Sequence, residues 1–352
     1  MNMDKSFLIY GANGYTGELI TRYAVERGMR PILAGRNAAA VSELAAKHGL
    51  EHRVFSLDEL EKVDAALREV EMVLHCAGPF SITSRAMVEA CLRNKKHYTD
   101  ITGEIAVFEA CARLDEKAKA AGIMVMPGVG FDVVPSDCLA RHLKDRLPSA
   151  THLSLAFYGM GRISHGTQAT MTMNVGNGGA IRKDGVITPV PAAWKTRAID
   201  FGEVTKTGVT IPWGDVATAF YSTGIPNIEV FTVVPPSNLK MMKMSRYLGW
   251  LLATGPFQRY LQKKIPAGGP SDEERSNGKT LLWGKASDAD GNRVESRQQG
   301  PEGYTITAIA ALNIAEKIIA GNFTAGYQTP AKAYGAHLVM EIDDVQRQDV
   351  AE

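Results

Sequence analysis

The chain opens with Phe7-Leu8-Ile9-Tyr10-Gly11-Ala12-Asn13-Gly14-Tyr15-Thr16-Gly17, in which an apolar run leads into a turn that carries three glycines. Apolar residues then recur at helical spacing over residues 19–24, and Gly28 ends the pattern. A buried strand, a glycine-rich turn and a helix in this order can hold phosphate groups on backbone N–H groups and on the positive end of the helix. We therefore expect a dinucleotide pyrophosphate at this turn, held by Gly11, Asn13, Gly14, Tyr15, Thr16 and Gly17.

The glycine spacing alone is a weak signal, because G-x-x-G-x-x-G occurs by chance in roughly one in three chains of this glycine content. The apolar run before it and the helical pattern after it give it weight. A strand, turn and helix without a ligand is the alternative. The spacing departs from the G-x-G-x-x-G of the standard fingerprint, which favours NADP enzymes with a more open loop as relatives.

The end of the second expected strand, at residues 31–34, indicates which dinucleotide is bound. NAD enzymes place an acidic residue there to bind the ribose 2′-OH, whereas this chain has Gly35-Arg36-Asn37. A guanidinium can bind a 2′-phosphate through its planar fork, so Arg36 favours NADP(H) over NAD(H). Asp58 is a candidate to contact the adenine. The alternative is that Arg36 is an ordinary surface arginine.

Composition is typical of a globular cytoplasmic enzyme. The chain has 352 residues, 39 basic and 38 acidic side chains, and 45% hydrophobic residues, which predicts two domains and no general attraction to nucleic acid. The four cysteines form no C-x-x-C and predict buried thiols, and the eight histidines include no H-E-x-x-H motif, so no metal is expected. No secretory segment and no apolar run of membrane-spanning length is found.

Strand and helix patterns alternate down residues 1–148 and predict a Rossmann-type doubly wound parallel sheet as the dinucleotide-binding domain. Ligands of such sheets bind outside the carboxyl ends of the strands. The expected strand ends are the segments 77–80, 102–104 and 127–132. We therefore expect Ala77, Gly78, Pro79 and Gly103 to contribute to the cofactor site.

After Pro148 the pattern predicts an inserted α+β domain over residues 149–300, built on an antiparallel sheet. Expected strands lie at 152–158, 185–188, 216–222 and 228–234, an expected short helix at 166–178, and an expected hairpin turn at 288–292. Residues 301–352 are expected to form a C-terminal helix and a tail that return to the first domain.

Residues 237–264 form an expected amphipathic segment. Lys240, Lys243 and Arg246 recur at a spacing of three, while Met241 and Met244 begin an apolar set on another face. Such a helix can lie in a membrane interface or cover an acyl substrate. The alternative, which we favour at this point, is a core or dimer helix with a solvated basic rim. A homodimer and a peripheral lipid contact therefore both stay open.

Several motifs occur in order along nearly the whole chain. They are Gly11 to Gly17, Cys76-Ala77-Gly78-Pro79-Phe80, Tyr98-Thr99-Asp100-Ile101-Thr102-Gly103-Glu104, Gly130-Phe131-Asp132-Val133-Val134-Pro135-Ser136-Asp137, Trp283-Gly284, Pro301-Glu302-Gly303-Tyr304 and Tyr327-Gln328-Thr329-Pro330-Ala331. With them the chain resembles the saccharopine dehydrogenase-like oxidoreductases, in particular the trans-acting enoyl reductase branch. The resemblance implies an NADP-binding domain with an inserted α+β domain. The family includes lysine-pathway enzymes and lipid-associated enoyl reductases, so it fixes the substrate poorly.

Hydride transfer from NADPH usually needs a proton donor within hydrogen-bond reach of the acceptor. The candidates follow from position: Asp132 in the turn after the sixth strand, and Tyr158 and His165 where the second domain begins. Tyr98 and Glu104, around the fifth strand, are further candidates. For each of them a structural role is the alternative.

The sequence thus predicts an NADP-dependent oxidoreductase that transfers hydride to an enoyl or carbonyl group of an apolar substrate, lipid-derived substrates included. A second interpretation is an imine or opine-type reductase, although no obvious arginine cluster at a strand end is present to bind two carboxylates. The third is an NADP-binding, lipid-associated protein without turnover.

Overall fold

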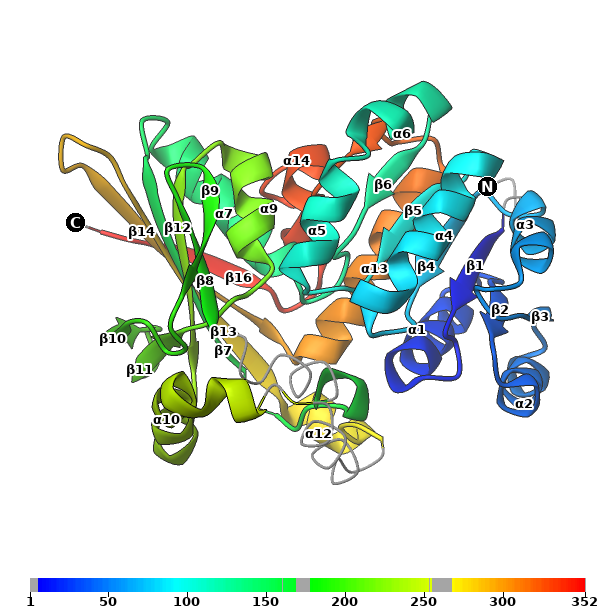
Figure 1. The fold of residues 1–352 in the computed structure, drawn as a ribbon, viewed down its shortest axis with the longest axis horizontal. Coiled ribbons are helices and arrows are strands. Elements are labelled where there is room, and N and C mark those ends of the chain that lie inside the picture. The colour runs from blue at the N-terminus through cyan, green and yellow to red at the C-terminus, as the bar shows by residue number, and fades with distance from the viewer. Residues whose placement is uncertain (1–5, 160, 169–177, 253, 255–267, 352) are drawn as a thin grey trace. The chain divides into compact units, whose positions relative to one another are not determined.

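The computed structural model describes residues 6–159, 161–168, 178–252, 254 and 268–351, and the chain divides into two compact units (Figure 1). Unit 1 comprises Met1–Val134 and Tyr304–Ala333, and unit 2 comprises Pro135–Gly303 and Tyr334–Glu352. The boundaries expected from the sequence were 148 and 300. The last segment is shared, because residues 304–333 count with unit 1 whereas the final strand pairs within unit 2.

Unit 1 contains a seven-stranded sheet in the order β15-β6-β5-β4-β1-β2-β3, and all of its strand pairs are parallel. The order of its first six strands is that of the dinucleotide-binding Rossmann fold, so the predicted fold class is confirmed. Strands β1, β2, β4, β5 and β6 are buried along their whole length, as expected of a parallel sheet with helices on both faces. The strands are β1 (Phe7–Tyr10), β2 (Ile32–Gly35), β3 (His52–Val54), β4 (Met72–His75), β5 (His97–Asp100), β6 (Met124–Met126) and β15 (Gly326–Tyr327).

Helices cover both faces of this sheet. They are α1 (Tyr15–Glu26), α2 (Ala38–His48), α3 (Leu60–Arg68), α4 (Phe80–Asn94), α5 (Ile105–Ala112), α6 (Asp115–Ala121), α13 (Gly303–Ile319) and α14 (Pro330–Tyr334). Helices α1 and α13 lie side by side, because Arg27 donates to the Asn313 Oδ1 at 2.8 Å and Tyr15 meets Tyr304 edge to face. Helices α3, α4 and α5 pack along one another in sequence.

The helical segment between β5 and β6 is divided into two helices, α5 and α6. The break falls between Arg113, the C-cap residue of α5, and Leu114, the N-cap residue of α6. Asp115 then begins α6, and its carboxylate accepts a hydrogen bond from the Tyr327 N–H at 2.7 Å. Helix α6 is thereby attached to strand β15, a long-range contact that the local pattern does not reveal.

Unit 2 is built on a nine-stranded sheet in the order β10-β11-β12-β7-β13-β14-β16, with β8 paired to β12 and β9 paired to β8. Its pairs are antiparallel except β7 with β12, so the expectation of an antiparallel sheet needs correction to a mixed one. The two strands run parallel because β8 to β11 and a helix lie between them in the chain. The strands are β7 (His152–Gly159), β8 (Gly179–Lys183), β9 (Val186–Val190), β10 (Thr196–Asp200), β11 (Thr205–Thr210), β12 (Asn227–Val233), β13 (Lys279–Ser287), β14 (Arg293–Pro301) and β16 (Gln346–Val350).

The strand expected at residues 216–222 is wrong, because this segment is helix α9 (Asp215–Thr223). Seven of its nine residues are buried, so the apolar pattern carries no clear helical period. The Arg182 guanidinium donates to the Val216 carbonyl at 2.8 Å near the start of the helix. Gly224 ends it in the left-handed conformation, at φ 71°.

The other helical elements of unit 2 are α7 (Val134–Arg146), α10 (Pro236–Leu252), α12 (Asp272–Asn277) and the short 3-10 helix η1 (Leu338–Glu341). The expected strands at 152–158, 185–188 and 228–234 are confirmed as β7, β9 and β12. The expected hairpin is β13–β14. Most of the helix expected at 166–178 lies outside the described residues.

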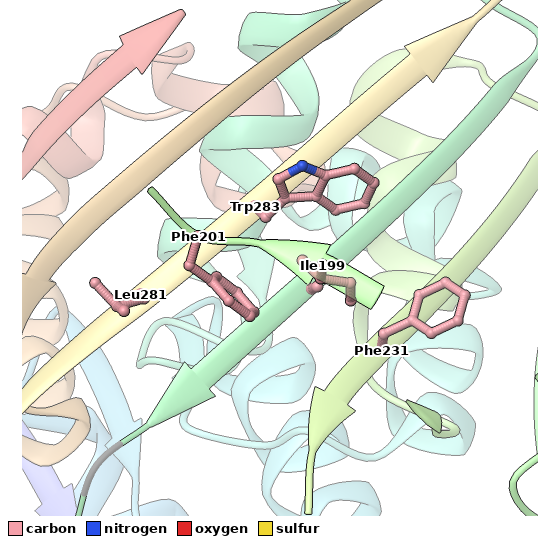
Figure 2. Close-up of a cluster of buried hydrophobic side chains, with 6 residues drawn as sticks. Ile199, Phe201, Phe231, Leu281 and Trp283 are labelled. Atoms are coloured by element: carbon pink, nitrogen blue, oxygen red, sulfur yellow. The ribbon is translucent and has the colours of Figure 1, made fainter. Parts of the chain in front are cut away.

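A cluster of buried side chains forms the core on one face of the nine-stranded sheet (Figure 2). Figure 2 shows Ile199 and Phe201 lying over Leu281 and Trp283, with Phe231 beside them. Strands β10 and β13 are four positions apart in the sheet order, so the sheet must curl to bring these residues together.

Candidate functional site

The turn after β1 lies at the carboxyl edge of the seven-stranded sheet and is anchored to β2. The N–H groups of Gly11 and Ala12 both donate to the Ala34 carbonyl, at 2.8 and 3.1 Å. Gly11 has φ +84°, and a Cβ on Gly17 would lie 2.4 Å from the Gly11 oxygen. Glycine is therefore required at positions 11 and 17 for the helix to approach the turn this closely.

Helix α1 begins without a side-chain cap. Its N-cap residue is Gly14, which is exposed, as is Asn13 beside it, while Tyr15 and Thr16 are half-buried in the first turn. A helix start of this kind offers backbone donors and a positive dipole end to an anion. By contrast, the Glu104 carboxylate accepts from the Phe80 and Ser81 N–H groups at 2.8 and 3.1 Å and so caps α4.

The residues expected to contact the adenosine half of NADP(H) follow the ends of β2 and β3. Arg36 follows Gly35 and is exposed, and Asp58 is exposed and accepts from the Ser56 hydroxyl at 3.3 Å. Both charges act on the Tyr10 hydroxyl. Burial raises the pKa of this hydroxyl, the charge of Arg36 opposes the increase, and the charge of Asp58 adds to it. Arg36 and Asp58 therefore lie near the same edge of the sheet as the glycine turn.

The turn after β4 contains Ala77, Gly78 and Pro79, with a cis peptide bond between the last two. The Thr83 hydroxyl donates to the Ala77 carbonyl at 2.7 Å, which fixes the start of the turn. Gly78 is exposed, and the other two residues are half-buried. The turn therefore offers backbone surface at the sheet edge.

Asp132 lies against Gly103 at the ends of β6 and β5. A Cβ on Gly103 would lie 2.5 Å from the Asp132 Oδ2, so a glycine is needed there. The Asp132 Oδ1 is buried and has no hydrogen-bond partner among the described residues. Burial raises the pKa of this carboxyl well above its usual range, because the charged form is disfavoured away from water.

Two buried polar residues of this edge were not singled out from the sequence. The His75 Nε2 shares a hydrogen bond of 2.9 Å with the Thr83 hydroxyl, and burial lowers the pKa of His75 to about 3, so its imidazole is neutral. The Asp100 carboxylate accepts hydrogen bonds from three donors, and burial raises its pKa to about 6. The signal that could have found them is a titratable residue inside an apolar strand, which must be hydrogen-bonded or neutral.

The other catalytic candidates have visible structural contacts. The Tyr98 hydroxyl donates to Asp100 Oδ2 at 2.6 Å, and Glu104 caps α4. Tyr158 and His165 belong to unit 2. Tyr158 packs against the hydrophobic cluster. His165 is exposed, and its backbone N–H donates to the Gly268 carbonyl at 2.8 Å.

The described part of α10 differs from the expected segregation of basic and apolar faces. Met241 and Met244 are exposed, as are Lys240 and Lys243. Arg246 instead donates to the carbonyls of Ala192 and Ala193, at 2.7 and 2.6 Å. The side chains of Leu248, Leu251 and Leu252, which continue the apolar set that Met241 and Met244 begin, are not described, and residues 255–264 lie outside the described ranges.

Within the described ranges, no group of three or more His, Cys, Asp or Glu side chains is placed to hold a metal ion. Among the helices that the structure describes, none combines the length and the apolar character needed to cross a membrane.

The first domain matches a known family. The saccharopine dehydrogenase NADP binding domain family matches residues 7–126 of the chain. The match covers strands β1 to β6 and their carboxyl-end turns through β5. It confirms the predicted resemblance and the predicted cofactor, NADP(H).

Three curated relatives are similar over part of their length. A lipid droplet localized protein of Caenorhabditis elegans is 26% identical over 39% of this chain and 35% of its own. A saccharopine dehydrogenase-like oxidoreductase of Mus musculus is 23% identical over 56% of this chain and 46% of its own. A trans-acting enoyl reductase of Mycobacterium leprae is 30% identical over 39% of this chain and 35% of its own. The matches thus span less than half of each relative.

Among solved structures, the apo saccharopine dehydrogenase (L-Glu forming) of Saccharomyces cerevisiae is similar over 99% of this chain and 100% of that chain. The TM-score is 0.70 and the sequence identity 13%. This likeness shows that the whole chain, unit 2 included, has the fold of that enzyme.

Proposed function

We propose that the chain is an NADP(H)-dependent oxidoreductase that reduces an enoyl or carbonyl group of an apolar substrate, lipid-derived substrates included. The observation that carries the proposal is the carboxyl edge of the seven-stranded sheet. There an uncapped helix start after β1, an exposed arginine after β2 and, after β6, a carboxyl whose buried Oδ1 has no partner among the described residues lie along the same edge. These three features provide for a pyrophosphate, a 2′-phosphate and a proton transfer.

The cofactor supplies the hydride when it is bound. The turn from Gly11 to Gly17 binds the pyrophosphate on the N–H groups at the start of α1. Arg36 binds the 2′-phosphate, and Asp58 lies beside it for the adenine. Ala77, Gly78, Pro79 and Gly103 line the nicotinamide half with small surfaces, so that a substrate can lie against the ring.

Asp132 is the proposed proton donor. As hydride reaches the β-carbon of an enoyl group or the carbon of a carbonyl, negative charge develops on the α-carbon or the oxygen. The neutral Asp132 carboxyl transfers its proton to that atom and becomes a carboxylate, which solvent reprotonates. Its raised pKa suits this step, because burial favours the protonated form that a proton donor needs. Tyr158 and His165 stay alternative donors.

Two observations support an apolar substrate. The names of relatives include an enoyl reductase and a protein of lipid droplets. In addition, Met241 and Met244 on α10 expose 63% and 61% of their surface next to Lys240 and Lys243. Apolar side chains bordered by cations suit contact with an anionic lipid surface.

A second candidate function is reduction of an imine formed between two amino-acid substrates. The likeness in fold to saccharopine dehydrogenase favours it. Substrates of this kind carry carboxylates that need arginine partners. Formation of a homodimer is compatible with either function.

The experiment is a test of NADPH oxidation by the purified protein with three sets of acceptors: acyl-chain enoyl thioesters, long-chain aldehydes and ketones, and amino acids paired with 2-oxo acids or aldehydes. We expect turnover with the first or second set, and preference for NADPH over NADH. Turnover only with the third set supports the imine reductase. Tight NADPH binding without turnover in any set supports a non-catalytic role.

The role of Asp132 is tested with Asp132→Asn, matched to Asp290→Asn on an exposed turn of the β13–β14 hairpin. We expect Asp132→Asn to lower kcat about 100-fold, in line with loss of general acid catalysis, while NADPH affinity stays unchanged. Asp290→Asn should behave as the wild type. Full turnover by Asp132→Asn would move the assignment to Tyr158 or His165.

A further inference from the structure

Strand β5 lies between β4 and β6 in the seven-stranded sheet. Two carboxylates stand at its carboxyl end, Asp100 as its last residue and Glu104 four residues later. Between them lies the turn that contains Thr102 and Gly103. The Asp100 carboxylate accepts a hydrogen bond from the turn after β6, and the Glu104 carboxylate accepts hydrogen bonds from the residues that follow the turn after β4.

Asp100 joins the end of β5 to the turn after β6. Its Oδ1 accepts from the N–H groups of Thr102 and Gly128 at 3.0 and 2.9 Å, and its Oδ2 accepts from the Tyr98 hydroxyl at 2.6 Å. The Asp100 carbonyl accepts from the Val129 N–H at 2.8 Å. The side chain is fully buried. Asp100 therefore fixes the beginning of the turn that carries Asp132.

The turn after β6 has little freedom to move. Gly128 has φ +75°, and a Cβ there would lie 2.6 Å from the Phe108 ring and 3.2 Å from the Asp132 carbonyl. At the end of the turn the Asp132 carboxyl lies against Gly103. Moving the turn would therefore move the Asp132 carboxyl relative to Gly103.

Glu104 joins the end of β5 to the turn after β4. Its Oε1 accepts from the Phe80 N–H at 2.8 Å and its Oε2 from the Ser81 N–H at 3.1 Å. Its own N–H donates to the Thr102 hydroxyl at 3.1 Å, so the turn after β5 is internally bonded as well. The residues held by Glu104 directly follow Ala77, Gly78 and Pro79.

We infer that Asp100 and Glu104 are positioning residues that hold three turns, at 77–79, 102–104 and 128–132, in one arrangement for the nicotinamide half of NADP(H). The inference rests on the proposed function. In a doubly wound sheet the pyrophosphate crosses at the first strand, so the ends of β1 to β3 serve the adenosine half and the ends of β4 to β6 serve the other half. Asp100 and Glu104 act only on the second half.

This division gives a test with two ligands. NADPH engages both halves of the site, whereas adenosine 2′,5′-bisphosphate engages only the adenosine half. Calorimetry with both ligands should be run on the wild type, Asp100→Asn, Glu104→Gln and Arg36→Ala. The matched control is Glu61→Gln, on an exposed position of α3.

We expect Asp100→Asn and Glu104→Gln to weaken NADPH binding about tenfold. Each variant replaces one oxygen of a charged carboxylate by an amide NH₂ group, so one hydrogen bond that the carboxylate accepts is lost. Their affinity for adenosine 2′,5′-bisphosphate should stay within about twofold of the wild type. Arg36→Ala should weaken both ligands, and Glu61→Gln neither. Asp100 is buried whereas Glu104 is half-buried, so Glu104→Gln keeps the test valid if Asp100→Asn does not fold.

Three results would overturn the inference. Normal NADPH binding by both variants would mean that the turns are held without these carboxylates. Equal weakening of both ligands would mean that Asp100 and Glu104 support unit 1 as a whole. If the wild type itself binds neither ligand, the proposed function fails and the inference falls with it.

Discussion

The seven-stranded sheet of unit 1 is parallel throughout, whereas the nine-stranded sheet of unit 2 has one parallel pair among antiparallel neighbours. Parallel strands bring their carboxyl ends to one edge, and in unit 1 six successive ends gather glycine turns, Arg36 and Asp132 there. Antiparallel strands distribute their ends over both edges. In unit 2 polar groups instead join strands, as where the Arg297 guanidinium donates to Asp200 at 2.6 Å. The proposed cofactor and proton-donor residues thus lie in unit 1, whereas the polar contact between Arg297 and Asp200 in unit 2 stabilises its sheet.

The largest effect should come from the core of unit 2. Phe231 is 1% exposed within the hydrophobic cluster, so Phe231→Ala should lower the free energy of unfolding by about 3–5 kcal/mol. All four tryptophans, at 194, 213, 250 and 283, belong to unit 2, so tryptophan fluorescence in urea reports on this unit. NADPH affinity below the transition should stay that of the wild type. Val186→Ala, at an exposed position of β9, is the control.

A parallel loss of NADPH affinity in folded Phe231→Ala would break the contrast between the units. It would mean that the packing of the nine-stranded sheet contributes to the cofactor site. A loss of stability below about 1 kcal/mol would mean that the curled sheet does not depend on this cluster.

The next largest effect should be Gly14→Val. Gly14 has φ −81°, which other residues adopt, and a Cβ there would meet only the Gly11 oxygen, at 3.3 Å, so a small shift of the turn should let valine fold. Its methyl groups would stand at the start of α1, and NADPH affinity should fall about 100-fold, or about 2.7 kcal/mol. Gly17→Ala should instead lower the melting temperature, because its Cβ would clash with the turn. Normal NADPH binding by Gly14→Val would place the pyrophosphate elsewhere.

An effect of similar size is a pH dependence of stability at Asp100. Its pKa is raised by burial from 3.8 to about 6, so between these values the folded state binds more protons than the unfolded state. Stability from this group is complete below about pH 4 and is lost as pH rises through about 6, by on the order of 3 kcal/mol. In urea titrations, the stability of Asp100→Asn relative to the wild type should therefore rise over this window. A constant difference from pH 4 to 7 would contradict the assignment.

Arg36→Ala should have a smaller effect, limited to one cofactor. Loss of a charge-assisted hydrogen-bond pair to the 2′-phosphate should weaken NADPH binding by about 1–3 kcal/mol and leave NADH binding nearly unchanged. Arg30→Ala, on the same unit before β2, is the matched control. Competition binding with both cofactors measures the difference. Equal weakening of both would mean that Arg36 does not contact the 2′-phosphate.

The fold of unit 1 could be predicted because its signals are local. Each strand is a short apolar run followed by small residues, and the parallel order then places the turns at one edge without further information. The positions predicted to bind cofactor all follow strands of this sheet, although their contacts with a cofactor stay predictions. The double role of Glu104 in capping one helix and beginning another was not predictable, since it joins residues 24 positions apart.

Unit 2 was predicted less well for a physical reason. Helix α9 is buried on nearly all sides, so its residues show no period that separates a helix from a strand. The parallel pairing of β7 with β12 depends on the path of the intervening chain, not on either strand. The direction of Arg246 toward Ala192 and Ala193 likewise follows from a contact across more than 50 residues.

The smallest expected effect concerns α10, the one part of unit 2 for which we propose contact with lipid. Lys240→Glu with Lys243→Glu should reduce flotation with anionic vesicles several-fold, because each lysine near such a surface contributes about 1 kcal/mol. Arg246 is left intact, since its bonds to Ala192 and Ala193 hold the helix in the unit. The matched control is Lys117→Glu with Lys183→Glu, which changes the net charge equally at exposed positions of other elements. High salt should weaken wild-type flotation, because it screens these charges. If the wild type does not float with vesicles, or if the control pair reduces flotation as much as Lys240→Glu with Lys243→Glu does, α10 has no specific lipid contact. An apolar substrate must then reach the cofactor from solution.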